Sequence, residues 1–336
     1  MNRVVIIVAV LLWASPSSLL AGQVRPQEDA AEIHPSYDLS HLELSPERRA
    51  ELQSALMEKT YKDAETILVD EINKDPQSFR AASLLEFAGG IFFLDGQYSN
   101  SVIAWKKAEA IAPLDEHSKF TLAMADIKLK RRDWARIELA KLSTSYPGNS
   151  LYVYWLARLD YDAQQYKEAI TKLEKVTELD PKMTRAYDLL GLCYDYLGLL
   201  DEATKYFTRA VELNRAQAIS SPWPSLDLAI SQIELNLLAD AEKNLRESLS
   251  YDSRMPQARY QLGRVLEKEG RLPEAIEALK ISAALDLNYP EPHYLLGQIY
   301  HRLGKLKLAE SEVQQFQHLQ KPSVPAITAG TSHPEN

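Results

Sequence analysis

The sequence contains little of what catalytic and metal-binding sites are commonly built from. Its 336 residues include 1 cysteine, 7 histidines and 12 glycines. One cysteine excludes an intramolecular disulfide, so the fold must be stabilised without one. We expect Cys193 to be a small buried residue, because free cysteine is among the most buried residue types. The alternative is a reactive thiol.

Known catalytic and phosphate-binding motifs are absent as well. The chain has no G-x-S-x-G, H-E-x-x-H, G-x-x-x-x-G-K or G-x-G-x-x-G. His293 and His301 lie eight residues apart in one expected helix, about 80° apart around its axis, and no third ligand is near in sequence. We therefore expect no enzyme activity, no cofactor and no metal. An enzyme would need an unfamiliar site.

Basic residues are in the minority. Lys and Arg number 38 against 47 Asp and Glu, a net charge of -9. Binding along a phosphate backbone needs a basic surface, so nucleic acid is not an expected partner. With 46% hydrophobic and 25% charged residues, the composition is that of a folded protein.

The first 22 residues have the composition of a secretory signal peptide. A short basic start, Met1 to Arg3, precedes the apolar run Val4 to Ala14, and small residues follow, with Ala21 before a possible cut. Eleven apolar residues are fewer than the roughly 20 that span a bilayer. We expect cleavage and export to the periplasm or the cell exterior of a bacterium. The alternative is an inner-membrane anchor formed by residues 4–14.

Three further segments follow. Residues 23–44 are polar, contain Pro26 and Pro35, and show no helical period, so we expect a flexible leader. Ser45 suits a helix N-cap and Pro46 a first helical position, which marks the start of a folded region, 45–321. Residues 322–336 have no periodic pattern and are expected to form a disordered tail.

Within the folded region, residues 184–217 show the spacing around which the rest of the chain is organised. Two apolar stripes at helical spacing are separated by a break at Gly198. The first stripe has a small residue, Gly191, and the second has Ala203, where crossing helices must come close. The stripes consist of Tyr187, Leu190, Gly191 and Tyr194, then Leu200, Ala203, Phe207, Ala210 and Leu213.

This pattern recurs in steps of 34 residues, with three extra residues near Phe79 and four near Ser220. Small residues occupy the place of Ala203 in every copy, and prolines often close the second helix. The copies begin near Ser45, Ala82, Glu116, Ser150, Thr184, Pro222, Pro256 and Pro290, and their small residues are Ala64, Ser101, Ala135, Ala169, Ala203, Ala241, Ala275 and Ala309.

The spacing of the aromatic residue, the Leu-Gly pair, the tyrosine and the second-helix alanines resembles the tetratricopeptide repeat. The resemblance implies an all-α fold, a right-handed superhelical solenoid of about eight helix-turn-helix repeats. It also implies a concave groove, lined by the first helix of each repeat, that binds a peptide or a partner protein. One subtype clamps a C-terminal carboxylate with Lys and Asn, but the matching places here hold Arg49, Gln53, Glu86 and Gly90, then Phe120 and Met124, so that function is not expected.

We expect the groove on the side of the first helices away from the Leu-Gly stripe. The alternative is that these residues pack against neighbouring first helices. The function we expect is a non-enzymatic protein-interaction scaffold of the bacterial envelope; the alternative is a repeat subunit of an enzyme complex whose catalytic part is on another chain. The expected groove residues are Phe120, Met124, Ile127, Tyr154, Arg158, Tyr161, Leu226, Ile230, Ile233, Tyr260, Arg264 and Tyr294.

Overall fold

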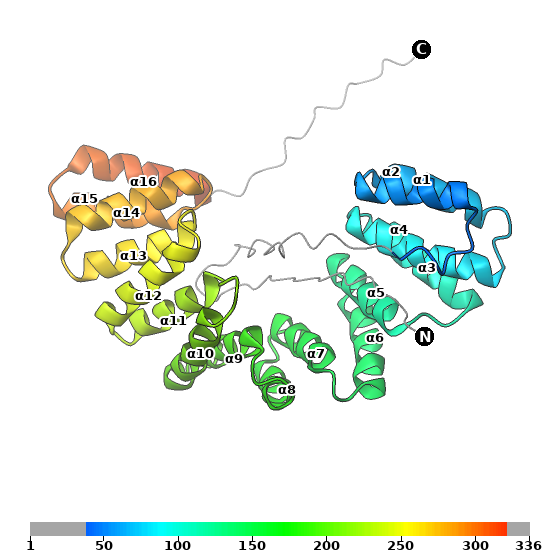
Figure 1. Cartoon of the computed structure of the whole chain (residues 1–336). Coiled ribbons are helices and arrows are strands. Elements are labelled where there is room, and N and C mark those ends of the chain that lie inside the picture. Colours follow the sequence, from blue (N-terminus) through cyan, green and yellow to red (C-terminus); the bar gives the residue numbers. More distant parts are fainter. Residues whose placement is uncertain (1–37, 321–336) are drawn as a thin grey trace, which may run out of the picture. The chain divides into compact units, whose positions relative to one another are not determined.

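The computed structural model describes residues 38–320, which form α-helices and the turns between them (Figure 1). The expected signal peptide, most of the expected leader and the expected tail lie outside the described residues. No strand is present from residue 38 to residue 320. The chain divides into two compact units, which meet between Ala186 and Tyr187. The all-α solenoid fold expected from the sequence is confirmed.

Unit 1 contains four helix pairs and the first residues of α9, in which the boundary between the units falls. Contacts join each helix to the next along the chain from α1 to α7 and α7 to α8. The helices are α1 (Pro46–Met57), α2 (Tyr61–Ile72), α3 (Phe79–Leu94), α4 (Tyr98–Ile111), α5 (Glu116–Lys128), α6 (Arg132–Ser145), α7 (Ser150–Asp162) and α8 (Tyr166–Leu179).

Unit 2 contains the remainder of α9 and the last three and a half pairs. Its core is built mainly from alanine, leucine and other aliphatic side chains of α11 to α16. The helices are α9 (Thr184–Tyr196), α10 (Leu200–Arg215), α11 (Trp223–Glu234), α12 (Leu238–Tyr251), α13 (Pro256–Lys268), α14 (Leu272–Leu285), α15 (Glu291–Arg302) and α16 (Leu306–Gln320).

Each helix pair is joined by a tight turn that contains one residue with positive φ. Four of these residues are glycines, which adopt this conformation without steric cost; Gly198, which interrupts the apolar pattern in the sequence, is one of them, with φ 73°. They recur every 34 residues, except for steps of 37 from Lys59 to Gly96 and 38 from Gly198 to Asn236, which match the three and four extra residues seen in the sequence and confirm the repeat phase. The turn residues are Lys59, Gly96, Lys130, Gln164, Gly198, Asn236, Gly270 and Gly304.

The small second-helix residues are buried at the helix crossings, as their register predicts. Ala203 is fully buried, and so is Ser101, whose hydroxyl donates to the carbonyl of Gly89 at 2.7 Å. A Cβ on Gly263 would lie 2.6 Å from the side chain of Leu279, so a larger residue there would force the two helices apart. Close approach within each pair therefore depends on these small side chains.

Residues 38–44 are packed, although we expected the flexible leader to extend to residue 44. Leu39, Leu42 and Leu44 are buried, and the carbonyl of Leu42 accepts a hydrogen bond from Arg49 of α1 at 3.2 Å. The leucines recur every two or three residues, so they bury apolar surface without a helical period. The folded region therefore includes residues 38–44.

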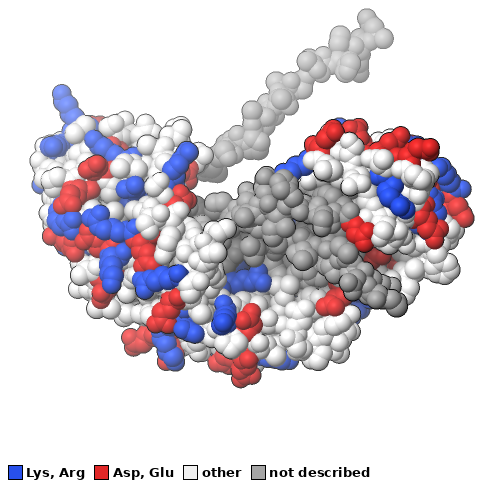
Figure 2. Space-filling model, viewed as in Figure 1, with Lys and Arg blue, Asp and Glu red and all other residues white. Residues whose placement is uncertain are grey.

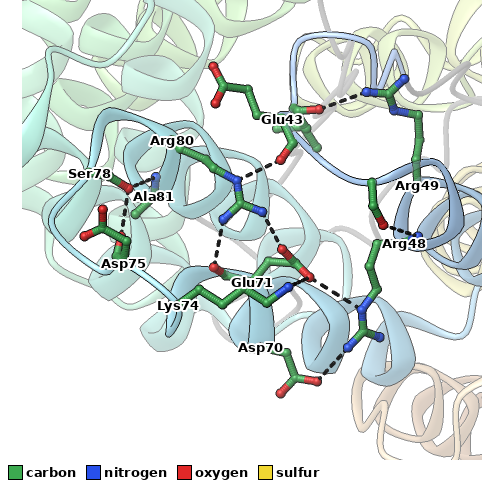
Figure 3. Close-up of polar contacts among 12 residues, drawn as sticks. Glu43, Arg48, Arg49, Asp70, Glu71, Lys74, Asp75, Ser78, Arg80 and Ala81 are labelled. Carbon is green, nitrogen blue, oxygen red and sulfur yellow. Dashed lines mark hydrogen bonds and ion pairs between the residues drawn. The ribbon is translucent and has the colours of Figure 1, made fainter.

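A buried carboxylate, Glu71 of α2, binds three cations near this segment (Figure 3). Lys74 contacts its carboxylate at 2.5 Å, Arg48 at 3.5 Å, and Arg80 donates a short bond to it. Arg80 also donates to the carbonyl of Glu43 at 2.7 Å. These contacts join residues 38–44, α1, α2 and α3, and they hold the pKa of Glu71 below its ordinary value, chiefly through the hydrogen bond from Lys74.

The extra residues between α10 and α11 form an ordered connection. The side chain of Asn214 caps it, donating to the carbonyl of Ser221 and accepting from the amide of Ser221, both at 2.8 Å. The hydroxyl of Ser220 donates to the carbonyl of Asn214 at 3.1 Å. Trp223 then packs into the core at the start of α11. The insertion is thus accommodated by local hydrogen bonds and one buried indole.

Among the helices from residue 38 to residue 320, none has the length and apolar character needed to cross a membrane.

Candidate protein-interaction surface

Some first helices of successive pairs pack directly against each other. In unit 1, α3 contacts α5, and in unit 2, α11 contacts α13 and α13 contacts α15. Successive second helices are bridged by long charged side chains, for example Glu242 to Arg271 at 2.8 Å. Side chains between neighbouring first helices are therefore covered, and only those that point away from both neighbours remain accessible.

This packing makes the predicted groove residues of unit 1 part of the interior. Met124 is fully buried, and Phe120 is buried with its ring 5.5 Å from that of Tyr152. Tyr154 is 1% exposed, because its ring packs on Trp155 at 5.7 Å and under the Arg185 guanidinium at 4.6 Å. The prediction of a solvent-facing side is wrong for these residues. The alternative, packing between first helices, accounts for them.

Arg158 and Tyr161 are also buried rather than solvent-facing. Arg158 is buried and forms an ion pair with Asp162, one turn further along α7, at 3.2 Å. Its guanidinium lies 5.8 Å from the ring centre of the buried Tyr161. The expected arginine-aromatic pairing is present, but both side chains are covered. Ile127 is partly buried.

In unit 2, the predicted apolar trio on α11 also belongs to the core. Leu226 and Ile233 are each 1% exposed and pack with Met255 and Leu262 of the next repeat, and Ile230 packs on the same cluster while partly buried. The trio is apolar because it packs against α13. The solvent-facing position that we expected is wrong for Leu226 and Ile233.

Tyr260, Arg264 and Tyr294 are the predicted residues that remain more accessible. Tyr294 is 48% exposed, and Arg264 keeps 24% of its side chain exposed. Arg264 donates to Gln261 at 2.9 Å and to Glu234 at 3.2 Å. Tyr260 is partly buried, and its ring packs edge-on against Tyr289 at 5.4 Å. A role for these three residues in binding stays a prediction.

Carboxylates accompany these residues on the first helices of unit 2, and the expected groove residues include none of them. Asp195 of α9 lies near Asp227 and Glu234 of α11, and burial together with those two charges raises the pKa of Asp195 to about 6. Burial also raises the pKa of Glu291 at the start of α15. We call Asp195, Asp227, Glu234, Tyr260, Arg264, Glu267, Glu291 and Tyr294 the first-helix face of unit 2.

A register signal for these acids was present in the sequence. Counted from the start of each repeat, Asp195 and Glu267 occupy the place that Ile127, Tyr161 and Ile233 occupy in other repeats. Matching two repeats already pairs Glu267 with Tyr161, and comparing all repeats adds Asp195 to the expected surface.

Two of the carboxylates have arginine partners. Arg264 contacts Glu234 at 3.2 Å, and Arg302 forms a short ion pair with Glu267. Asp195 has no cation partner within residues 38–320. Acidic side chains therefore outnumber basic ones on the first-helix face of unit 2. On the side of the molecule seen in Figure 2, by contrast, both signs of charge are interspersed over unit 2, and acidic side chains gather over α1 and α2.

The histidine pair and the cysteine offer no metal site. His293 contacts Glu312 of α16 at 2.7 Å, while His301 of the same helix is exposed. Cys193 is fully buried. From residue 38 to residue 320, no three His, Cys, Asp or Glu side chains are placed together as metal ligands would be.

Two family profiles match parts of the repeat region. The profile described as "Tetratricopeptide repeat" matches residues 184–217, and the profile described as "TPR repeat" matches residues 263–304. The first match spans the stretch from which the repeat phase was read. The chain thus contains tetratricopeptide repeats. Repeats of this family are generally non-catalytic interaction modules, which supports a protein partner for the chain.

Solved structures of similar fold include a tetratricopeptide repeat protein from Parabacteroides merdae, at 16% identity and TM-score 0.58. The match covers 79% of this chain and 98% of the Parabacteroides merdae chain. Pseudomonas aeruginosa PilF matches at 18% identity and TM-score 0.55, over 65% of this chain and 97% of that one. PilW, described as a widely conserved type IV pilus biogenesis factor, matches at 19% identity and TM-score 0.54, over 60% and 92%. At these identities the likeness establishes the fold alone.

A short sequence match joins the chain to Anaphase-promoting complex subunit 3 of Dictyostelium discoideum. The two are 40% identical over 68 residues, which is 20% of this chain and 7% of that protein. The chain therefore spans only a small part of that relative's length.

Proposed function

We propose that this tetratricopeptide repeat protein is a non-enzymatic scaffold that binds a partner protein through the first-helix face of unit 2, and that the bound segment carries lysine or arginine. The observation that carries this proposal is the placement of the partly buried Asp195 near two further carboxylates, Asp227 and Glu234; burial first, and then these two charges, raise the pKa of Asp195 to about 6. Like charges held together favour a cationic ligand, since the ligand relieves their repulsion.

The aromatic side chains of this face support the same kind of partner. Tyr294 exposes 48% of its surface beside the ring of Phe316, 5.0 Å away. Tyrosine rings attract ammonium and guanidinium groups through their faces, and tyrosine is enriched at binding hot spots. An extended basic segment would find carboxylates on α9 and α11 and tyrosines on α13 and α15.

Selection from a random peptide library tests this proposal without a known partner. Peptides of about 12 residues, long enough to contact several repeats when extended, are displayed and panned against the full chain. The enriched peptides should contain more lysine and arginine than the input library. Enrichment of acidic or purely apolar peptides, or no enrichment, would refute the proposed charge preference.

A charge-neutral variant locates the selected surface. Asp195→Asn with Asp227→Asn should abolish the enrichment of basic peptides. Glu277→Gln is a matched control, because Glu277 is an exposed carboxylate on α14, away from the first helices. If the control lost the enrichment to the same extent, net charge rather than this face would explain the selection.

We further propose that the scaffold works in the bacterial envelope. The basic start, the apolar run 4–14 and the small residues up to Gly22 support a cleaved signal. Residues 1–30 fused to a reporter that is active only after export should give an active, processed product with a new N-terminus near Gly22 or Gln23. An inactive fusion that keeps Met1 in the cytoplasm would contradict export. An active fusion that keeps Met1 in the membrane would favour the anchor instead.

A further inference from the structure

Two buried polar groups in unit 2 lack hydrogen-bond partners, and they come from the same end of α15. Tyr289 precedes this helix and is 1% exposed, yet its hydroxyl has no partner within residues 38–320. Glu291 begins α15, and its Oε2 is also buried without a partner. Buried polar atoms are nearly always satisfied, so two such atoms two residues apart require a reason.

Tyr260 of α13 completes the cluster. Its ring meets the ring of Tyr289 edge-on at a centroid distance of 5.4 Å. The charge of Glu291 raises the pKa of both phenols, and the charge of Arg264 lowers both, so the four groups lie within electrostatic reach of one another. Burial is the largest cause of the raised pKa at Tyr260 and at Tyr289, so both phenols are neutral and able to donate or accept.

Arg264 does not satisfy the two orphan atoms. Its Nη1 donates to Gln261 at 2.9 Å and its Nη2 to Glu234 at 3.2 Å. The guanidinium is thus directed to α11 and to its own helix, and Glu234 offsets its charge. The carboxylate of Glu291 remains without a cation partner from residue 38 to residue 320.

A single group that satisfies both atoms would be compact and would donate hydrogen bonds, and beside the carboxylate of Glu291 a positive charge is favoured. A primary ammonium has three donors on one small charged centre and can contact a carboxylate, a phenol oxygen and a tyrosine ring together. A guanidinium is larger and planar, and an anion would be repelled by Glu291. A metal ion would require more ligands than one carboxylate provides.

We propose that Tyr260, Tyr289 and Glu291 form a subsite for a primary ammonium group of the partner, either a lysine side chain or a free N-terminus. This inference rests on the proposed function, in which the partner binds the first-helix face of unit 2. The ammonium group bound in the subsite fixes the register of the bound segment. Asp195 and Asp227 attract the other positive charges of that segment.

The test uses peptides of defined ends and tyrosine signals of the full chain. An N-acetylated, C-amidated alanine peptide with one central lysine is compared with its acetyl-lysine form and with a lysine-free alanine peptide that has a free N-terminus. Binding is followed by nuclear magnetic resonance of ring-labelled tyrosine, with the Tyr289 signal assigned by its loss in Tyr289→Phe. The lysine peptide should shift the Tyr289 signal saturably, and the acetyl-lysine form should not.

The third peptide separates the two sources of the ammonium. If the free N-terminus shifts the Tyr289 signal and the lysine does not, the subsite binds chain ends; the reverse result assigns it to lysine. No shift with either amine would overturn the subsite.

Two conservative variants test the assigned contacts. Glu291→Gln and Tyr289→Phe should each weaken binding of the responding peptide at least tenfold in titration calorimetry, which does not depend on the Tyr289 signal, while Glu277→Gln should leave it unchanged. Tyr289→Phe should not lower the melting temperature, because its hydroxyl has no partner in the fold; a lower melting temperature would show that the hydroxyl is structural and would overturn its assignment.

The subsite and the wider face fail in different ways. If the lysine peptide binds, and binding depends on Asp195 and Asp227 but not on Glu291 or Tyr289, the subsite is wrong and the basic-partner proposal stands. If Asp195→Asn with Asp227→Asn has no effect while Glu291→Gln abolishes binding, the subsite stands and the wider acidic face does not contribute.

Discussion

The indole of Trp105 covers Gly89 so closely that a Cβ on this glycine would lie 2.6 Å from two atoms of the ring. Trp105 is 1% exposed, and its Nε1 donates to the carbonyl of Glu86 at 3.0 Å. The hydrogen bond and the surrounding core prevent the indole from moving aside. The crossing of α3 and α4 therefore requires glycine at position 89.

Replacing Gly89 by alanine should destabilise the protein by about 1–3 kcal/mol through overpacking. The adjacent glycine provides a matched control, because a Cβ on Gly90 would meet nothing within 4 Å. Gly90→Ala should be neutral or stabilise by about 0.5–1 kcal/mol, since glycine is costly inside a helix. Urea unfolding of both variants checks this, and equal midpoints would contradict the packing described here.

Removing the charge of Glu71 should destabilise unit 1 in a pH-dependent way. Its folded pKa lies below the ordinary 4.5, so its contribution to stability is present above that value and is lost as pH falls through the lowered pKa. Glu71→Gln should cost roughly 1–3 kcal/mol at neutral pH, because Arg80, Lys74 and Arg48 lose their shared partner. The difference between the unfolding curves of the two proteins should be smaller at about pH 3 than at about pH 7.

Asp126 should show the opposite dependence. It is 1% exposed, its oxygens accept no hydrogen bond within residues 38–320, and the nearest Arg131 nitrogen is 3.9 Å away. Burial raises its pKa above the ordinary 3.8, so the destabilising contribution of Asp126 is smallest at low pH and grows as pH rises from 3.8 through the raised value. Asp126→Asn should therefore stabilise by about 1 kcal/mol at neutral pH and have little effect in acid. A destabilised variant at neutral pH would contradict this account.

Binding of a basic segment should also depend on pH. A cation near Asp195 favours the carboxylate and lowers its pKa from about 6, so affinity for a lysine-containing peptide should increase as pH rises from about 5 to about 7. Asp227 and Glu234 of α11 are the charges that raise this pKa. Asp195→Asn should flatten the profile measured by titration calorimetry. An unchanged profile would assign the pH dependence to another group.

The repeat phase could be predicted from the sequence because its determinants are local. A left-handed turn residue such as Gly198 and a small crossing residue such as Ala203 are specified by a few neighbouring positions, and both lie where the pattern places them. The packed segment 38–44 was missed because Leu39, Leu42 and Leu44 follow no helical or strand period.

The accessible surface could not be predicted in the same way. Whether Met124 or Leu226 faces solvent depends on how closely the next first helix approaches, which involves residues about 30 positions away in a neighbouring repeat. Exposed Tyr294 and buried Tyr154 occupy the same place in their repeats. Tyr294 differs because α15 is the last first helix of the described chain, with no further first helix to cover it.

The central claim is that the first-helix face of unit 2 binds basic protein segments, and titration calorimetry of the full chain with two peptides tests it most directly. One peptide is lysine-rich, and the other has the same length with glutamate in place of lysine. The account predicts saturable binding of the lysine peptide, its loss in Asp195→Asn with Asp227→Asn, and no binding of the glutamate peptide. Equal binding of both peptides, or lysine-peptide binding unchanged by the two substitutions, would contradict the account.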